Sequence, residues 1–426
     1  MGSPLGVLVK PTSSVCNLDC NYCFYLQKAE MYPWDTRPRM TPELFERFVD
    51  QYAELSNAGF SFAWQGGEPT LMGLGFYEKA LDIEIRAARA HRTDGIWHIT
   101  NSLQTNGTLL DDAWADFFRA YQFLVGISLD GPAEWHNTYR RDRAGHATHA
   151  KVLKGMEALA LRGVEFNVLC AVQKSNVGHG RELLHYFADL GVTDVQFLPV
   201  AKSERLKGHL AGYSISPEEY GRFLEETFDE WMRIGHRRIR IRFFDNLIQL
   251  LLGLPSQMCI VAPTCGQYVV LEHNGDCYPC DFFVEREWYL GNIASTPLRT
   301  MVMSDAFRRF TLRKSVLHED CRGCEWRPVC HGECPKYRML TSPSAEGSLP
   351  YFCGSYKQFY GSSYDRVWRV AAAVGEEVSE QRRDVQTHAL ALGIASTDAC
   401  PCGSGETLGS CCGGPDLKLV ELKKVK

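Results

Sequence analysis

Three cysteines near the N-terminus could hold an iron–sulfur cluster that keeps one position open. Cys16, Cys20 and Cys23 follow one another with C-x3-C-x2-C spacing in SVCNLDCNYCFYLQ, and two aromatic residues come directly after the third cysteine. A structural zinc site or a closed cubane cluster takes four protein ligands, so three thiolates leave one iron of a [4Fe–4S] cluster without a protein ligand. A zinc knuckle with a distant fourth ligand, or free buried cysteines, are the alternatives for this stretch taken alone.

The chain has seventeen cysteines in 426 residues, which is its dominant compositional feature. Its first residues, MGSPLGVLVKP, lack the charged region and long apolar core of a signal peptide, so we expect a cytoplasmic protein with reduced thiols. The cysteines therefore predict metal or cluster ligation in place of disulfides. Cys170, inside an apolar segment, is expected in the core.

The overall composition is that of an ordinary globular protein. Hydrophobic residues make up 45% and charged residues 23% of the chain, and the formal net charge is −5. This charge gives no electrostatic reason to expect nucleic acid or an anionic membrane as a partner. No apolar run approaches the ~20 residues of a membrane span. We expect no nucleic-acid or membrane partner, and a monomer.

Short β-rich segments alternate with helical patterns through the first half of the chain. Strands are expected at 6–11, 60–67, 97–107, 123–131, 164–172 and 193–200, with helices between them at 41–56, 75–92, 111–120, 148–162 and 179–190. Six successive β/α units predict a parallel sheet that curls into a partial, TIM-like (β/α)6 barrel of the α/β class. Because chemistry in such barrels lies at the carboxyl ends of the strands, CNLDCNYC, GGEP, NSLQTNG and SLDG should share one mouth.

The pattern divides the chain into four expected regions. Residues 1–235 form the barrel, and residues 236–375 form a cysteine-rich domain with flanking helices, the last of them at 354–385. Residues 376–398 are expected as a linker, and residues 399–426 as a small cysteine-containing tail.

The first cysteine motif resembles that of the radical S-adenosylmethionine superfamily, whose aromatic-rich loop is matched by Tyr22, Phe24 and Tyr25. The resemblance implies that the open iron chelates the amino and carboxylate groups of S-adenosylmethionine. A reduced cluster then cleaves the cofactor and releases a 5′-deoxyadenosyl radical, while the protein orients the cofactor and excludes water. Tyr25 is accordingly a candidate cofactor-binding residue.

The motif QGGEP at 65–69 is a second candidate for binding this cofactor. Its two glycines allow a close approach of the backbone to a ligand, and carbonyl groups there, with Glu68 nearby, can accept hydrogen bonds from the methionyl ammonium. Polar residues in SLDG and in HNTYRRDRAG are candidates for the ribose and carboxylate ends, although strand ends also form ordinary turns. The residues proposed from these motifs are Gln65, Gly66, Gly67, Glu68, Ser128, Asp130 and Arg140.

The cysteines of the second half resemble those of a SPASM domain, which carries two auxiliary [4Fe–4S] clusters. The segment CRGCEWRPVCHGECP has C-x2-C-x5-C-x3-C spacing and is followed by a distant cysteine. The resemblance assigns Cys259, Cys265, Cys280 and Cys334 to the first auxiliary cluster, and Cys321, Cys324, Cys330 and Cys353 to the second. Zinc is the structural alternative, because four-thiolate spacing does not distinguish it from iron–sulfur. Cys277 is an extra thiol outside the pattern.

A wider resemblance covers about residues 6–370. The segments KPTSSVCNLDCNYCFY, WQGGEPTLMGLGFY, NSLQTNGTLLDDAW, SLDGPAEWHNTYR and CYPCDFFV are similar to those of the anaerobic sulfatase-maturating enzymes. This resemblance implies oxidation of a cysteine or serine in an unfolded sulfatase polypeptide, within C/S-x-P-x-R, to formylglycine. The family places the base that takes the substrate proton directly after the YPC cysteine, which here is Asp281. A capping role for Asp281 is the alternative.

The tail sequence CPCGSGETLGSCC resembles the SEC-C motif. The resemblance implies a tetrahedral zinc site formed by Cys400, Cys402, Cys411 and Cys412, with iron or a disordered tail as alternatives. We expect a flavodoxin or ferredoxin as the electron donor. Two other functions stay open: a SPASM enzyme that cross-links a ribosomal peptide through thioether or carbon–carbon bonds, and a non-enzymatic iron–sulfur carrier or zinc scaffold.

Overall fold

The computed structural model describes residues 5–56, 59–91, 98–204, 209–341, 346–402, 404, 406–414 and 419. A sheet with ten strands in the order β12-β11-β10-β1-β2-β3-β4-β5-β6-β9 runs through the described part of the chain. Strands β1 to β6 occupy Gly6–Lys10, Gly59–Trp64, His98–Thr105, Leu124–Ser128, Phe166–Val172 and Asp194–Pro199. Each pairs in parallel with the next, which confirms the partial barrel. Residue 97, expected in the third strand, lies outside the described residues.

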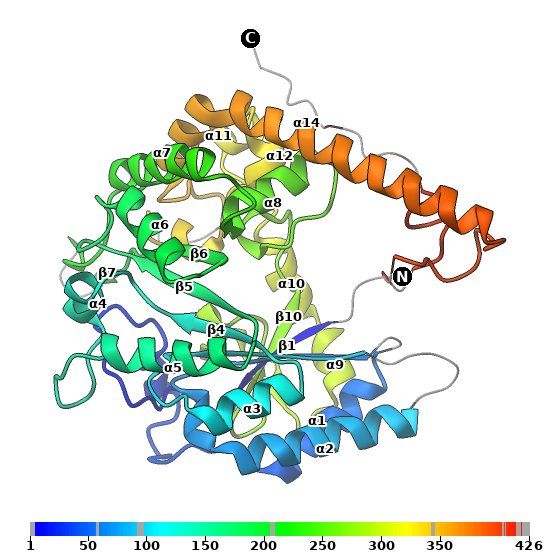
Figure 1. Cartoon of the computed structure of the whole chain (residues 1–426). Coiled ribbons are helices and arrows are strands. Elements are labelled where there is room, and N and C mark those ends of the chain that lie inside the picture. Colours follow the sequence, from blue (N-terminus) through cyan, green and yellow to red (C-terminus); the bar gives the residue numbers. More distant parts are fainter. Residues whose placement is uncertain are drawn as a thin grey trace.

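Helices cover the outer side of this curved sheet (Figure 1). They are α1 Pro42–Ala53, α2 Leu74–His91, α3 Asp112–Ala120, α4 Ala133–Tyr139, α5 His149–Leu161, α6 Gly180–Asp189, α7 Pro217–Ile234 and α8 Arg242–Leu251. Their starts follow from the sequence. The Thr41 side chain accepts a hydrogen bond from the Leu44 amide, with a proline at the first helical position, and Ser216 and Glu219 form a capping box at α7.

The cysteine-rich second half extends the same sheet. Strand β10 (Tyr268–Glu272) pairs in parallel with β1, so that Lys10 lies opposite Glu272. Strands β11 (Asp276–Tyr278) and β12 (Gly291–Asn292) continue the sheet antiparallel, while the two-residue strand β9 (Arg240–Ile241) pairs with β6. This arrangement brings two regions that are more than 250 residues apart in sequence against one another.

The remaining elements are short, except for the last helix. They are β7 Ser203–Glu204, β8 His209–Leu210, α9 Leu298–Val302, α10 Asp305–Arg313, α11 Glu319–Arg322, α12 Arg327–Cys330, α13 Pro335–Arg338 and α14 Cys353–Ala391, with 3-10 helices η1 Leu26–Met31, η2 Pro69–Met72, η3 Cys259–Val261, η4 Asp281–Phe283 and η5 Arg286–Trp288. Of the described helices, none combines the length and apolar character needed to cross a membrane.

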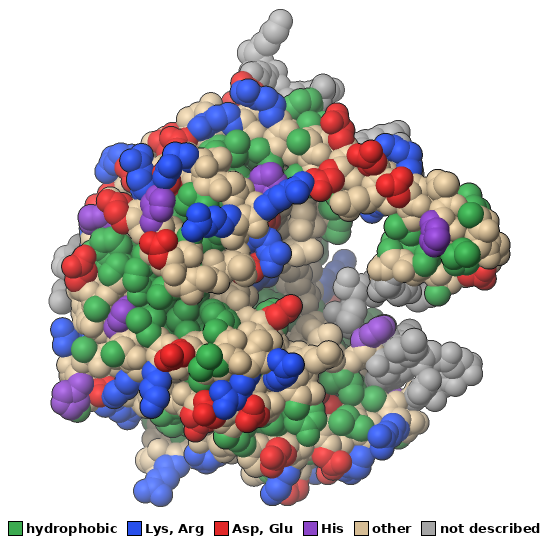
Figure 2. All heavy atoms as spheres, in the orientation of Figure 1, with side chains coloured by type: hydrophobic (Ala, Val, Ile, Leu, Met, Phe, Trp, Pro, Cys, Tyr) green, Lys and Arg blue, Asp and Glu red, His purple; other side chains and the backbone are tan. Residues whose placement is uncertain are grey.

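Helix α14 begins against the body and ends away from it. Near its start, the Ser355 hydroxyl donates to the Pro217 carbonyl at 2.6 Å, and Arg366 forms an ion pair with Asp229 of α7. Its far end carries the cysteine tail as an arm that stands out from the molecule (Figures 1 and 2). The helix expected at 354–385 thus continues into the residues expected as a linker. The basic end of the tail lies outside the described residues.

The core beneath β2 and β3 contains a buried carboxyl group on α2. The Glu84 side chain is fully buried, and one of its oxygens accepts a hydrogen bond from the Asn101 amide at 2.7 Å. Asn101 in turn accepts a hydrogen bond from the Trp64 indole at 2.6 Å. Burial raises the pKa of Glu84 to about 8, so the folded protein holds this carboxyl group in its neutral form at pH 7.

Replacing Glu84 by Gln should make the protein more stable, and increasingly so as the pH rises from 5 to 8. The unfolded chain loses this proton near pH 4.5 and the folded chain near pH 8, so unfolding is favoured across that interval by up to about 1.4 kcal/mol per pH unit. Gln removes the titration. Chemical denaturation at pH 5 and pH 8 measures the effect, with Glu78→Gln on the exposed side of α2 as the control. If Glu84→Gln changed the free energy of unfolding by the same amount at both pH values, the raised pKa of Glu84 would be contradicted.

Candidate functional site

The first three cysteines lie together on the loop that follows β1. Cys20 is buried and Cys16 and Cys23 are half-buried. The Asn106 side chain approaches the Cys16 sulfur at 3.7 Å, from the loop after β3. Burial raises the pKa of Cys16 to about 11 and that of Cys20 to about 12, and neighbouring thiolates add to the effect. The thiols therefore need the charge of bound metal to become ligands, as an iron–sulfur site provides.

The GGEP loop after β2 is clamped onto this cysteine loop by its backbone. The Gly67 amide donates to the Ser13 carbonyl at 2.7 Å, and the Glu68 amide donates to the Val15 carbonyl at 2.9 Å. A Cβ atom on Gly67 would lie 2.0 Å from the Val15 carbonyl oxygen, and one on Gly66 would lie 2.7 Å from that of Ser13. Only glycine permits this close approach, so the two glycines shape the cysteine loop.

Replacing Gly67 by Ala should separate the two loops. The added methyl group meets backbone, which cannot rotate away, so we expect a loss of about 1–3 kcal/mol or more in the free energy of unfolding and weaker binding of S-adenosylmethionine. Denaturation and equilibrium binding with the reconstituted protein measure this. Gly75→Ala is the matched control, because its Cβ would meet nothing within 4 Å. If Gly67→Ala and Gly75→Ala had the same free energy of unfolding and bound S-adenosylmethionine equally well, the contact between Gly67 and the Val15 carbonyl would not be needed.

Glu68 ties the GGEP loop to the end of β3. Its side chain is fully buried. One carboxylate oxygen accepts hydrogen bonds from the Thr70 amide at 3.0 Å and from the Thr105 hydroxyl at 2.8 Å, and the other accepts from the Asn106 amide at 2.8 Å. Glu68 therefore acts on the site through the loops that it holds. The Gln65 amide donates to the Val9 carbonyl at 2.9 Å and continues the pairing with β1.

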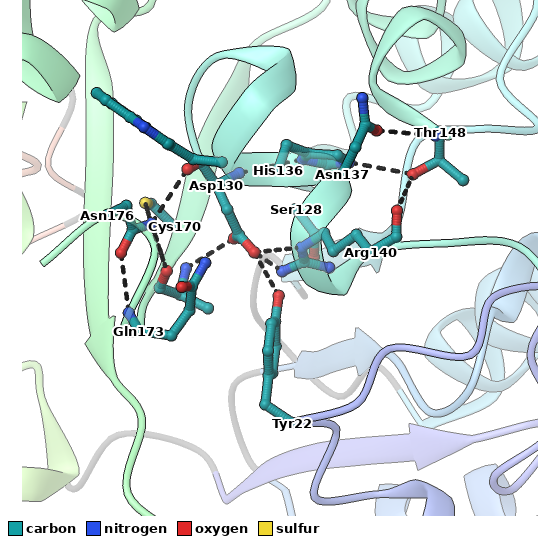
Figure 3. A network of polar contacts seen from close by, with 12 residues as sticks. Tyr22, Ser128, Asp130, His136, Asn137, Arg140, Thr148, Cys170, Gln173 and Asn176 are labelled. Atoms are coloured by element: carbon teal, nitrogen blue, oxygen red, sulfur yellow. Dashed lines mark hydrogen bonds and ion pairs between the residues drawn. The ribbon is translucent and has the colours of Figure 1, made fainter. Parts of the chain in front are cut away.

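The carboxylate of Asp130 is the centre of a second network, which reaches the cysteine loop (Figure 3). The Arg140 guanidinium donates to both carboxylate oxygens, at 2.8 and 3.1 Å. The Tyr22 hydroxyl, from the turn between the second and third cysteines, donates to one of them, and the Ala171 amide to the other at 2.9 Å. Asp130 is fully buried, so it fixes Arg140 and Tyr22 in place.

A buried histidine, His136, contacts the backbone of Asp130 directly and that of Arg140 through Thr148. The Asp130 amide donates to Nδ1 of His136 at 3.3 Å, and the other ring nitrogen lies 3.1 Å from the Thr148 hydroxyl, which donates to the Arg140 carbonyl at 2.8 Å. Burial lowers the pKa of His136 to about 3, so the ring is neutral. Ser128 stands apart from this network and accepts a hydrogen bond from the Gln104 amide at 3.1 Å.

Asp281 lies where the two halves of the chain meet. The Tyr268 hydroxyl donates to one of its carboxylate oxygens at 3.1 Å, and also contacts the Cys280 sulfur at 3.3 Å. The other oxygen is 3.8 Å from the Lys10 ammonium nitrogen. The Asp281 side chain is 10% exposed, so the carboxylate is almost enclosed beside a cysteine sulfur.

Lys10 links the Asp281 carboxylate to the cysteine loop that follows β1. Its ammonium lies 4.3 Å from the centre of the Tyr25 ring, and the Tyr25 hydroxyl donates to Glu272. Lys10 is 1% exposed. Desolvation lowers its pKa, and the charges of Asp281, Glu272, Cys280 and Cys23 oppose that shift. Tyr25, a candidate cofactor residue, is thus linked to Asp281 through one lysine.

The cysteines of the second half form two groups. Cys321, Cys324, Cys330 and Cys353 line one partly open pocket. Cys259 faces Cys265 and Cys334, and Cys334 faces Cys280, which brings the other four together. All seventeen cysteines are free. Cys170 and Cys277 are buried outside these groups.

Buried cations around these groups fit anionic clusters. Lys314 is fully buried, and its ammonium donates to the carbonyls of Cys259 and Ile260 at 2.7 and 2.8 Å. Among the charged groups near this lysine, the cysteine sulfurs have the strongest electrostatic effect on its ammonium. An enclosed ammonium needs a negative partner, and iron-bound thiolates supply one. The donor set therefore fits iron–sulfur clusters in this region.

The tail cysteines are close enough to share one ion. The sulfurs of Cys400, Cys402, Cys411 and Cys412 all lie within 4.8 Å of one another, with 3.4 Å between the second and third. Tetrahedral zinc with Zn–S bonds of about 2.3 Å separates its sulfurs by roughly 3.8 Å. A hydrogen bond with Ser404 lowers the pKa of Cys402 to about 6, which favours the thiolate that a metal needs.

Two family models match the chain where these sites lie. The radical SAM superfamily model matches residues 11–187, and the model of an iron–sulfur cluster-binding domain matches residues 259–325. The protein is therefore a radical SAM enzyme with a TIM-like α/β core and a cysteine-rich SPASM domain.

Curated relatives narrow this class. A serine-type anaerobic sulfatase-maturating enzyme of Bacteroides thetaiotaomicron is 37% identical over 84% of this chain and 89% of its own length. A cysteine-type anaerobic sulfatase-maturating enzyme of Clostridium perfringens is 37% identical over 86% of this chain and 98% of its own length. This chain belongs to the family of anaerobic sulfatase-maturating enzymes.

Solved structures agree with this membership. The structure of native anSMEcpe with bound AdoMet and Cp18Cys peptide is 37% identical, has a TM-score of 0.78, and covers 87% of this chain and 100% of its own. Streptococcus suis SuiB bound to its precursor peptide SuiA has a TM-score of 0.58 at 15% identity, with 82% of this chain and 76% of its own covered, and shares the fold.

Several residues of the site were not expected from the sequence. Lys10, His136 and Tyr268 each contact a predicted site residue. Lys10 carries a signal that could have been used, since it is the charged last residue of the apolar strand GVLVK. The other two lie in ordinary polar or aromatic surroundings, where their partners become visible only once the strands are placed. Tyr22 was expected as part of the aromatic-rich loop, but its hydrogen bond to Asp130 was not.

Proposed function

We propose that this chain oxidises a cysteine or serine in a C/S-x-P-x-R motif of an unfolded sulfatase polypeptide to Cα-formylglycine. The reaction is independent of oxygen and cleaves S-adenosylmethionine to 5′-deoxyadenosine and methionine. The observation that carries the proposal is the 37% identity to both serine-type and cysteine-type maturases over more than four fifths of the chain. Enzymes of this family are oxidoreductases that generate formylglycine.

The cluster on Cys16, Cys20 and Cys23, once bound to S-adenosylmethionine, supplies the radical that removes hydrogen from the substrate Cβ. The protein groups proposed to bind the cofactor are those expected from the sequence: Tyr25, Gln65, Gly66, Gly67, Glu68, Ser128, Asp130 and Arg140. The contacts of Glu68 and Asp130 support roles for both as anchors of neighbouring loops. The backbone of the GGEP loop and the exposed part of Arg140 are then left for the cofactor itself.

Asp281 is the proposed base. It takes the proton from the SH or OH group of the substrate, and a cluster held by Cys280 and its neighbouring cysteines would accept the accompanying electron. The near-enclosure of its carboxylate, next to Cys280 and in contact with Tyr268, supports this role because a base in a dry site is well placed for proton transfer. Lys10 holds the opposite oxygen and fixes the orientation of the carboxylate.

Three [4Fe–4S] clusters and one zinc ion complete the proposed set of metal sites. Four cysteines would hold each auxiliary cluster and would leave no iron open, which suits electron transfer. Counting should therefore give about twelve irons per reconstituted chain. A flavodoxin or ferredoxin is the proposed electron donor, and the enzyme is proposed to be a cytoplasmic monomer. The proposed domains are residues 1–235, 236–375 and 399–426, with residues 376–398 between the last two.

The zinc site should be separable from the iron sites. Changing Cys400 and Cys412 to Ser should remove about one zinc per chain and leave the iron content unchanged, because these sulfurs pack with Ala389 and Leu408 in a small cluster of their own. Metal analysis by mass spectrometry after reconstitution measures both elements. Loss of iron in the same variant would show that the tail belongs to an iron site.

Peptide conversion tests the function directly. The anaerobically reconstituted enzyme, a reductant and S-adenosylmethionine are incubated with ~20-residue peptides that carry C-x-P-x-R or S-x-P-x-R. An aldehyde on either peptide, detected by mass spectrometry and hydrazine capture, is the expected result, and the more reactive peptide shows the substrate type. Release of 5′-deoxyadenosine with both peptides unchanged would contradict the proposal that the substrate is a sulfatase polypeptide.

The alternative function, cross-linking of a ribosomal peptide, is addressed by the same assay. A thioether or carbon–carbon cross-link also removes two hydrogens, but it leaves no aldehyde to capture. The likeness to SuiB supports the shared fold alone.

A further inference from the structure

Two buried cations lie near the auxiliary cysteine groups, one at the carbonyl of Cys259 and the other at the carbonyl of Gly332. Lys314 follows α10 and is fully buried, and Arg338, the last residue of α13, is 1% exposed. The Arg338 guanidinium donates to the carbonyls of Gly332, Val316 and Lys314 at 2.8 to 3.0 Å. Lys314 also uses backbone carbonyls, as described above. Both cations thus donate their hydrogen bonds to uncharged backbone carbonyls.

The charges around these cations come from both cysteine groups. Those acting on Lys314 are the sulfurs of Cys334, Cys265, Cys259 and Cys330, and those acting on Arg338 are the sulfurs of Cys321, Cys334, Cys265 and Cys330. Of these five cysteines, three belong to the first group (Cys259, Cys265 and Cys334) and two to the second (Cys321 and Cys330). Each cation therefore faces both groups at once.

Other charged side chains do not remove this excess of positive charge. Glu333 is the acidic neighbour of both cations and is fully buried, and Lys336 adds a third cation to the same region. A guanidinium remains charged in any protein environment, and enclosing it without a negative partner costs several kcal/mol. The negative partners available in the fold are the iron-bound thiolates on either side.

Enclosed positive charge changes the electron affinity of a nearby cluster. Reduction adds a negative charge to the cluster, and a cation held a few ångströms away in a low dielectric stabilises the reduced form. Water screens exposed cations, so the effect depends on burial.

We propose that Arg338 and Lys314 form a cationic bridge between the two auxiliary clusters, which raises the reduction potential of both. The bridge makes the auxiliary region a better acceptor for the single electron that the substrate carbon radical releases when its heteroatom proton goes to Asp281. The proposal rests on the two auxiliary clusters of the proposed function.

Redox titration followed by electron paramagnetic resonance tests the bridge. The titration uses the full chain with Cys16, Cys20 and Cys23 changed to Ala, so that the signals come from the auxiliary clusters. Lys314→Met should shift both midpoint potentials to more negative values, and Lys314→Arg should restore them. Lys357→Met is the matched control, because Lys357 faces Cys321 and Cys353 but is exposed, and it should give a smaller shift.

Each outcome decides the question. Unchanged potentials in Lys314→Met with eight irons retained would overturn the bridge. If Lys314→Met loses its clusters, retention of the clusters and wild-type potentials in Lys314→Arg supports a requirement for charge, whereas loss in both variants overturns it in favour of side-chain shape. Fewer than about eight auxiliary irons in the unsubstituted background would instead count against the proposed cluster set.

Discussion

Asp281→Asn should stop formylglycine formation while S-adenosylmethionine cleavage continues. Asn has the same shape and can still accept the hydrogen bond from Tyr268, whose hydroxyl lies 3.1 Å from the carboxylate in the native protein. It cannot take a proton, so the substrate radical has no base to release it. General-base groups contribute about 10²–10⁴-fold to rate, and we expect a loss of aldehyde formation in that range.

Two products must be measured together in this variant. Liquid chromatography of 5′-deoxyadenosine reports cofactor cleavage, and mass spectrometry of the peptide reports oxidation. Glu285→Gln is the matched control, because Glu285 is a nearby carboxylate that is 42% exposed and pairs with Lys28. Formylglycine at a near-native rate in Asp281→Asn would contradict the assignment of the base.

Changing Cys16, Cys20 and Cys23 together to Ala should abolish cofactor cleavage altogether. The loss should be complete, because no other group in the described network offers three thiolates beside the GGEP loop. The auxiliary groups are built from cysteines after residue 258, and their surroundings include Lys314, Arg338 and the α14 start. We therefore expect about four irons to be lost and about eight to remain.

Iron counting and the deoxyadenosine assay measure this prediction. Cys170→Ala and Cys277→Ala are the controls, because both sulfurs are buried outside the three cluster groups, and both variants should keep about twelve irons. Loss of nearly all iron in the triple variant would contradict the expectation that the N-terminal and auxiliary sites bind iron independently. Loss of four irons in Cys277→Ala would show that the Cys277 thiol is a cluster ligand.

Much of the fold could be predicted from local patterns. The six parallel strands and the helices between them agree with the alternation of apolar segments, because strand and helix periodicity are encoded within each segment. The cysteine motifs could be found for a similar reason, because residue type and spacing are local. The four tail cysteines lie close together, and Cys321, Cys324, Cys330 and Cys353 line one pocket, while their roles as ligands stay a prediction.

The environment of the site could not be predicted in the same way. Glu68 and Asp130 were expected to contact the cofactor, and the structure shows that both carboxylates are occupied by hydrogen bonds within the protein. Their motifs identify the right loops. Which partner each oxygen takes depends on how neighbouring strands meet, and that information is not local.

The sequence by itself indicated the class of chemistry through its cysteine motifs: three cysteines near the N-terminus, eight in the second half, and four in a compact tail. Only the tertiary structure decided that β10 pairs with β1, which places Asp281 beside Lys10 and Lys10 beside Tyr25. The physical reason is that a short apolar strand specifies which face is buried but does not specify its partner. The pairing is selected by the packing of the whole sheet.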